Sequence, residues 1–149
     1  MENAPSEPAI VLSIIIVSYN SRVDLARCLP TLFSQQTQDS FEVIVVDNHG
    51  TDGVATELLT QYPQVRLIQN LANTGYAGGN NLGLAQAKGH WVLFLNPDTE
   101  LWPGCLERLM TTARQYPSAL ITPKLLNPDG TINACGNQMQ YTGITTCRG

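Results

Sequence analysis

The sequence has few charged side chains and no cluster of basic ones. Only 13% of its 149 residues are charged, and eight lysines and arginines occur singly against twelve aspartates and glutamates, giving a formal net charge of −4. A protein that binds along a nucleic acid backbone needs a basic patch to neutralise phosphates. We therefore expect no nucleic acid partner.

Long hydrophobic runs and paired cysteines are also lacking. The most apolar stretch covers only residues 9–17, whereas a helix that spans a membrane needs about 20, and the first residues lack the positive charge of a signal peptide. Cys28, Cys105, Cys135 and Cys147 are widely spaced, without the C-x-x-C pairs of a zinc site. We expect a cytoplasmic protein, with a peripheral position at the inner face of the membrane as an alternative.

The hydrophobic content of 43% predicts one globular domain. Short runs rich in β-branched residues predict strands, and the stretches between them have the apolar spacing of helices. The predicted strands are residues 12–18, 41–47, 65–69, 91–95 and 119–122. This alternation predicts an α/β fold with a mostly parallel sheet flanked by helices. We place the domain at residues 12–136, after an N-terminal extension at 1–11 and before an irregular tail at 137–149.

Two features of the first predicted helix concern its ends. Ser21 is a candidate N-cap with Asp24 at the capping-box position. Pro30 lies inside the helical pattern and is expected to kink or shorten the helix, because proline cannot donate the backbone hydrogen bond.

Polar residues stand at or just after the ends of four predicted strands. They are Ser18 and Asn20 at the first, Asp47 and Asn48 at the second, residues 70–75 at the third, and Asn96 and Asp98 at the fourth. Open α/β sheets bind ligands beyond the carboxyl ends of their strands. The sequence therefore predicts a binding site at one edge of the sheet.

The second strand ends in a carboxylate, Asp47, that can accept hydrogen bonds from a ribose or from the N–H of a pyrimidine base. The alternative is that Asp47 only shapes a turn or caps the next helix, as Asp residues often do. Asn48 is likewise a candidate for nucleotide contact, with a turn role as the alternative, since asparagine is common in turns.

A glycine-rich segment at residues 73–83 precedes the fourth strand. Its glycines, including Gly75 and Gly79, fall where a helix begins, so backbone amides there can approach a diphosphate at the positive helix end. Tight packing is the alternative role. No G-x-G-x-x-G pattern follows the first strand, which argues against a nicotinamide cofactor.

Asp98 follows a buried strand and can bind Mg²⁺ or Mn²⁺ while the metal takes diphosphate oxygens from a substrate. Such a metal stabilises a departing nucleotide diphosphate. The alternative is a Pro-Asp-Thr turn in which Asp98 caps the next helix.

Four motifs, in this order and spacing, resemble those of family 2 glycosyltransferases, especially the rhamnosyltransferase-like branch. They are SIIIVSYN at 13–20, VVDN at 45–48, NTGYAGGNNLG at 73–83 and FLNPD at 94–98. The resemblance implies a GT-A fold in which Ser18, Asn20 and Asp47 surround the nucleoside. It also implies that Gly75, Ala77, Gly79 and Asn80 lie near the diphosphate and sugar.

The resemblance implies an enzyme that binds a dTDP- or UDP-sugar and transfers the sugar with inversion to a saccharide or lipid-linked acceptor. Asn96-Pro97-Asp98 stands where the family has Asp-x-Asp, so Asn96 replaces the first acid and Asp98 is the only charged metal ligand. The general base of inverting members lies downstream in an acidic motif. Glu100, Glu107 and Asp129 do not match that context, and we expect the acceptor-binding portion and the base to be absent from this chain.

Two other functions stay open at this point: a non-catalytic nucleotide-binding or interaction domain, and a nucleotidyltransferase using the same edge of the sheet. A homo-oligomer is a further expectation, because an apolar face left uncovered by a missing acceptor portion favours association.

Overall fold

The computed structural model describes residues 10–135, 137–139 and 145–147. It divides the chain into two compact units, residues 1–105 and 106–149. The predicted domain of residues 12–136 extends over both units, and its limits stay a prediction.

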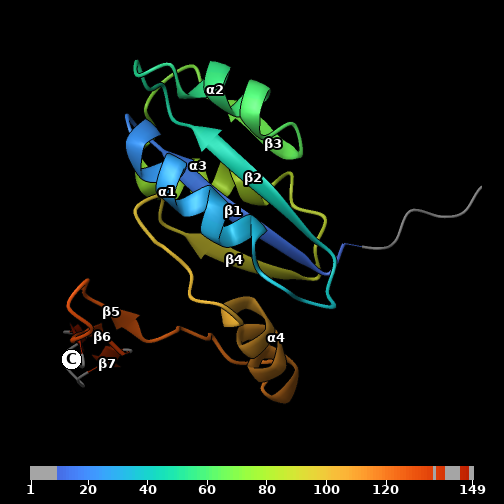
Figure 1. Cartoon of the computed structure of the whole chain (residues 1–149), viewed down its shortest axis with the longest axis vertical. Coiled ribbons are helices and arrows are strands. Elements are labelled where there is room, and N and C mark those ends of the chain that lie inside the picture. Colours follow the sequence, from blue (N-terminus) through green and yellow to red (C-terminus); the bar gives the residue numbers. More distant parts are fainter. Residues whose placement is uncertain (1–9, 136, 140–144, 148–149) are drawn as a thin grey trace, which may run out of the picture. The chain divides into compact units, whose positions relative to one another are not determined.

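The first unit contains a sheet of four strands (Figure 1). The strands are β1 (Leu12–Ser18), β2 (Phe41–Asp47), β3 (Val65–Gln69) and β4 (Trp91–Leu95), with the bounds that the apolar runs predict. Their order is β3-β2-β1-β4, and every pairing is parallel. The predicted parallel α/β fold is confirmed, and all four strands end at the same edge.

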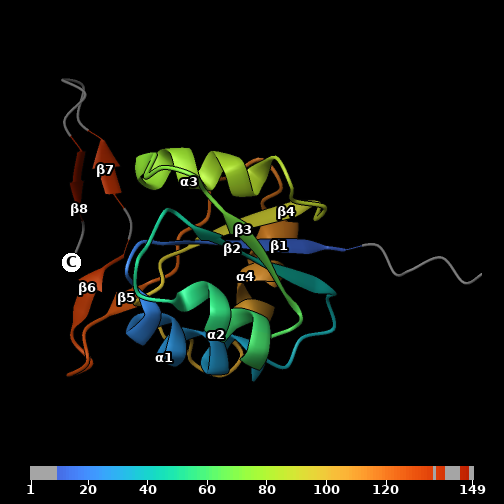
Figure 2. The same ribbon diagram turned by 90° about the horizontal axis from the view of Figure 1, so that it is seen from above.

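Helices cover both faces of this sheet. Figure 2 shows α3 (Gly75–Leu84) on one face, and α1 (Arg22–Phe33) and α2 (Val54–Gln61) on the other. All seven residues of β1 are buried. Continuous apolar runs are typical of strands that are covered on both sides.

Glycines let α3 pack closely on β1. A Cβ at Gly79 would lie 2.7 Å from a methyl group of Val17, and one at Gly83 would lie 2.5 Å from Cγ2 of Ile15. The glycine-rich segment therefore serves tight packing in its second half. Gly75, at the start of the helix, instead has a positive φ of 72° and open space around it.

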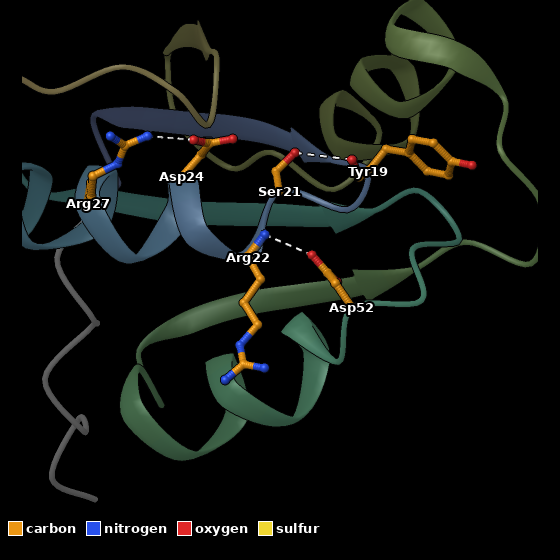
Figure 3. A network of polar contacts seen from close by, with 6 residues as sticks. All are labelled: Tyr19, Ser21, Arg22, Asp24, Arg27 and Asp52. Atoms are coloured by element: carbon orange, nitrogen blue, oxygen red, sulfur yellow. Dashed lines mark hydrogen bonds and ion pairs between the residues drawn. The ribbon is translucent and has the colours of Figure 1, made fainter.

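The predicted capping box at the start of α1 is wrong. Ser21 is the N-cap residue, but its hydroxyl donates to the Tyr19 carbonyl at 3.2 Å and makes no cap hydrogen bond. Asp24 pairs with Arg27 at 2.7 Å instead (Figure 3).

Asp52, which lies 30 positions further along the chain, takes over the capping of α1. Its Oδ2 accepts a hydrogen bond from the backbone N–H of Arg22 at 2.7 Å (Figure 3). Its Oδ1 accepts one from the N–H of Val54, the first residue of α2, at 3.2 Å. One carboxylate thus joins the starts of two helices, whose positive ends favour a negative charge.

Pro30 does not shorten α1, which continues to Phe33. The N–H of Ser34 donates to the Pro30 carbonyl at 3.0 Å, so the last turn is intact. Pro30 and Ala26 are both exposed. Water can therefore satisfy the Ala26 carbonyl that the missing proline N–H leaves without a partner.

In the second unit, α4 (Cys105–Gln115) is followed by a segment without the predicted strand at 119–122. Leu120 there is fully exposed. An apolar run with no pairing strand beside it does not form a strand, so this prediction is wrong.

Two short antiparallel pairs complete the described chain. The first joins β5 (Leu125–Leu126) and β6 (Ile132–Ala134) around the Asn-Pro-Asp-Gly turn at 127–130. The second joins β7 (Asn137–Met139) and β8 (Thr145–Cys147). The expectation of a wholly irregular tail is therefore corrected. No helix among the described residues is long and apolar enough to cross a membrane.

We predict that Gly83→Ala lowers the free energy of unfolding by about 1 kcal/mol. Overpacking against the buried Ile15 side chain costs about 1–3 kcal/mol, whereas alanine gains about 1 kcal/mol of helix propensity over glycine. Urea unfolding measures the difference. Asn81→Ala, at an exposed position of the same helix, is the control and should be neutral or slightly stabilising. Equal stability of Gly83→Ala and the unaltered protein would contradict this packing.

Candidate functional site

The ends of β1 and β2 bring two predicted site residues side by side. Ser18 and Asp47 are register partners in the parallel pairing. The N–H of Asn48 continues the pairing by donating to the Ser18 carbonyl at 2.8 Å. β4 ends at Leu95, next to Ile16 of β1, so Asn96 and Asp98 start from the same edge.

The loops after β1 and β2 are tied together by side-chain oxygens. Asn20, in a left-handed conformation with a φ of 54°, accepts a hydrogen bond from the Thr51 N–H at 2.7 Å through Oδ1. Asp47 accepts one from the Gly50 N–H at 2.9 Å, also through Oδ1. Asp47 therefore does shape the turn, but its Oδ2 accepts no hydrogen bond from the described residues. That oxygen is available to a ligand.

Asn48 is buried, with 2% of its surface exposed. Its Nδ2 donates to Oδ1 of Asn73 at 2.9 Å and to the Gly75 carbonyl at 3.1 Å. Its Oδ1 accepts from Nδ2 of Asn70 at 2.9 Å and from the N–H of Thr74 at 3.2 Å. Both amide hydrogens and the carbonyl oxygen are thus used inside the protein.

Two other predicted residues carry buried oxygens with no partner among the described residues. The Oγ of Ser18, which is fully buried, and the Oδ1 of Asn80 have no hydrogen bond. Asn80 does donate through Nδ2 to the Tyr76 carbonyl at 3.0 Å. Buried polar atoms are nearly always hydrogen-bonded in folded proteins, and each exception needs an explanation. A ligand or an ordered water would supply the missing partners.

The first backbone N–H groups of α3 have no acceptor within the helix. The first amides of any helix lack carbonyl partners within it, and Tyr76 and Ala77 in the first turn are exposed. The N–H of Gly75 is satisfied by Oδ1 of Asn73 at 2.9 Å. The amides of the following residues can therefore meet an anion.

Asp98 is exposed and makes no hydrogen bond or ion pair with the described residues. The Thr99 N–H donates to the Asn96 carbonyl at 3.3 Å, which closes a turn around it. The next helix, α4, begins only at Cys105. The alternative that Asp98 caps this helix is therefore wrong.

The segment that follows Asp98 is anchored on α1. The N–H of Leu101 donates to Oγ1 of Thr31 at 3.0 Å, and Nε2 of Gln35 donates to the Trp102 carbonyl at 3.1 Å. Sequence reasoning missed Thr31 and Gln35. The only signal was their spacing of four residues around the end of α1, which stops at Phe33.

A buried thiol lies close to the acidic segment. Burial raises the pKa of Cys28, and the negative charges of Asp98 and Glu100 act in the same direction, so that together they bring it to about 12. The potential around Asp98 is therefore negative, which favours a bound cation.

A metal at this site would depend on a single charged side chain. No group of three His, Cys, Asp or Glu residues capable of holding a metal occurs in the described part of the chain. Mg²⁺ commonly takes one or two carboxylates together with substrate phosphates and waters. An exposed and unbonded Asp98 fits that arrangement, provided that a diphosphate completes the ligand set.

Asp129 does not suit the role of a general base. It accepts hydrogen bonds from the N–H and Oγ1 of Thr131 at 2.9 and 2.6 Å, and these bonds lower the pKa of its carboxyl. A base must take up a proton near the working pH. Asp129 is therefore a turn residue.

A parallel α/β sheet with polar side chains at the carboxyl ends of its strands is the arrangement at which open α/β proteins bind their ligands. Residues 13–146 match the profile of glycosyl transferase family 2, and the chain belongs to this family. The resemblance noted in the four motifs is thus confirmed.

The chain is similar to two named sugar transferases. It is 32% identical over 141 residues to the N-acetylglucosaminyl-diphospho-decaprenol L-rhamnosyltransferase of Mycobacterium tuberculosis, covering 87% of this chain and 46% of that protein. It is 29% identical over 126 residues to the GalNAc(5)-diNAcBac-PP-undecaprenol beta-1,3-glucosyltransferase of Campylobacter jejuni, covering 82% and 40%. The chain thus spans less than half the length of these relatives.

Solved structures confirm the GT-A fold. The crystal structure of S. aureus TarS 1-349 aligns with a TM-score of 0.64 and 25% identity, over 76% of this chain and 38% of that one. The same protein in complex with UDP-GlcNAc aligns with a TM-score of 0.65 and 22% identity, over 78% and 38%.

We predict that Cys28 makes the protein less stable in alkali. Its pKa rises from 9.0 to about 12 on folding, so between these values the unfolded chain has lost a proton that the folded protein retains. The contribution is complete below pH 9 and is lost as the pH rises, by about 1.4 kcal/mol per pH unit. Urea unfolding at pH 8 and at pH 10 should show a loss about 1.4 kcal/mol larger than in Cys28→Ala. Equal losses in the two proteins would disprove the burial effect.

Proposed function

We propose that this chain binds the donor of a family 2 glycosyltransferase reaction, a dTDP- or UDP-sugar, at the carboxyl edge of its sheet. The observation that carries the proposal is the set of uncommitted oxygens at this edge. Oδ2 of Asp47, Oγ of Ser18 and Oδ1 of Asn80 have no partners among the described residues. A bound donor would supply the partners that these oxygens lack.

The nucleoside is assigned to the ends of β1 and β2. Asp47 offers a carboxylate oxygen to the ribose hydroxyls or to the N–H of a pyrimidine. Asn20 and Ser18 flank it, and the hydrogen bond from Thr51 to Asn20 fixes the loop around them. The nucleoside thus meets a surface already formed before binding.

The diphosphate is assigned to the space between α3 and Asp98. The first-turn amides of α3 donate to phosphate oxygens, and Asp98 holds Mg²⁺ or Mn²⁺. The bound metal would neutralise charge on the departing nucleotide diphosphate. Asn96, which is uncharged, can add only a neutral ligand.

The acceptor is proposed to be a lipid-linked saccharide at the inner face of the membrane. The two named relatives carry decaprenol or undecaprenol diphosphate in their names. Transfer would proceed by direct displacement at the anomeric carbon with inversion. We assign the general base to none of the described residues, and association with a second copy stays a prediction.

A non-catalytic nucleotide-binding domain is the second candidate. Asn96 in place of an acid favours it, as does the dependence of any metal site on Asp98 alone. Both functions predict binding of the donor, but only the transferase function predicts turnover of a nucleotide sugar.

We predict that the chain binds UDP or dTDP in the presence of Mn²⁺, and that Asp98→Asn weakens this binding by about tenfold or more. Loss of the carboxylate removes the only charged protein ligand of the metal. Calorimetric titration with each nucleotide, with Mn²⁺ and with chelator, measures the effect. Glu100→Gln removes an equal charge two residues away, from another exposed side chain, and should retain binding.

No binding of either nucleotide to the unaltered chain would refute the donor site. Binding that is equally strong with chelator and in Asp98→Asn would refute the metal assignment alone. An equal loss in Glu100→Gln would mean that Asp98 acts only through the general negative potential.

A further inference from the structure

We infer that Asn48 is a positioning residue that holds the start of α3 at the edge of the sheet and does not contact the nucleotide. This inference rests on the proposed donor function, because the held element is the one assigned to the diphosphate. It also changes the role that the sequence predicts for Asn48, which was direct nucleotide contact.

The side-chain hydrogen bonds of Asn48 all go to the connection between β3 and α3, including Gly75 at the start of the helix. Its carbonyl oxygen binds the two ends of the turn at Asn70 and Thr74, while its amide nitrogen binds Asn73 and Gly75. Asn48 itself is fixed to β1 through its backbone N–H. A single buried residue thus joins the ends of β1 and β2 to the turn before α3, through its backbone on one side and its side chain on the other.

Apolar packing does not hold this turn. Residues 71–77 are all exposed, and Leu71 has 92% of its surface in solvent. Hydrogen bonds therefore determine its conformation. The contacts form a relay in which Asn48 holds Asn73, and Asn73 in turn accepts the N–H of Gly75.

The relay fixes where the helix starts and which amides stay uncovered. It uses the N–H groups of Thr74 and Gly75, so the exposed amides begin at Tyr76. Gly75 has the positive φ that this sharp entry requires. The position of the next amides relative to Asp47, the neighbour of Asn48 in sequence, therefore depends on the Asn48 side chain.

Only an amide side chain satisfies this geometry. Aspartate has the same shape but no N–H, so an oxygen would face Oδ1 of Asn73 and the Gly75 carbonyl, and two hydrogen bonds would become repulsive contacts. Burial makes such unpaired groups costly. The Asn48→Asp variant therefore displaces the start of α3 with little change in volume.

The test compares uridine with UDP, each titrated into the full chain with Mg²⁺ and followed by NMR. In Asn48→Asp, we expect the Kd for UDP to rise by about tenfold or more, while the Kd for uridine changes by less than about twofold because Asp47 is untouched. Hydrogen exchange of the Thr74 and Gly75 amides should become faster. Asn81→Asp, the same change at an exposed position of α3, should bind both ligands normally.

A second variant guards against misfolding of Asn48→Asp. Asn73→Ala changes an exposed residue and removes the oxygen that connects Asn48 to the N–H of Gly75, so it should weaken UDP binding and spare uridine binding. The inference is overturned if UDP binding is unchanged in both variants, or if uridine and UDP binding weaken equally. Failure of the unaltered chain to bind either ligand would refute the donor function itself. If the unaltered chain binds UDP and both variants bind it equally well, only the role of Asn48 is refuted.

Discussion

Parallel strand pairing is the constraint on which the rest of this structure depends. Because β1 to β4 all run in one direction, every strand ends at the same edge of the sheet, and every connection to the next element begins there. Helices on both faces keep β1 and most of β2 buried up to their last residues. Polar side chains therefore gather at this edge, where Ser18 and Asp47 are register partners. The close approach of α3 through Gly79 and Gly83 then brings a helix start to the same place.

The polar residues at this edge have two separate roles, which their hydrogen bonds distinguish. The side chains of Asn48 and Asp52 form hydrogen bonds with loops and helix starts, and these bonds hold the edge in place. Ser18, Asp47 and Asn80 each keep an oxygen without a partner among the described residues, and Asp98 keeps its whole carboxylate uncommitted. Satisfied groups fix the geometry, whereas unsatisfied ones are available for chemistry. Family membership alone would not separate these two sets.

The sequence predicts the sheet well because continuous apolar runs bounded by polar turns determine where β1 to β4 begin and end. The same signal fails at residues 119–122, where an equally apolar run finds no pairing strand. It also fails at the start of α1, because Asp52 competes with Ser21 for the helix end from 30 positions away. The candidate site follows the same division. Strand ends indicate which residues reach the edge, but partners that lie 22 to 27 positions from Asn48 decide how its side chain is used.

The segment carrying Asp98 shows how the opposite side of the sheet contributes to the site. Thr31 in α1 and Gln35 just beyond its end hold the backbone of Leu101 and Trp102, 70 and 67 positions away, so the acidic turn is fixed at its far end. The nearby Cys28 stays protonated because its raised pKa reflects both burial and the carboxylates of Asp98 and Glu100. The thiol therefore adds no negative charge beside them. A bound cation would offset the negative charge of this segment, and a nucleotide diphosphate would bring the remaining ligands. A carboxylate of Asp98 without hydrogen bonds to the described residues therefore suits a metal site whose other ligands come from the substrate.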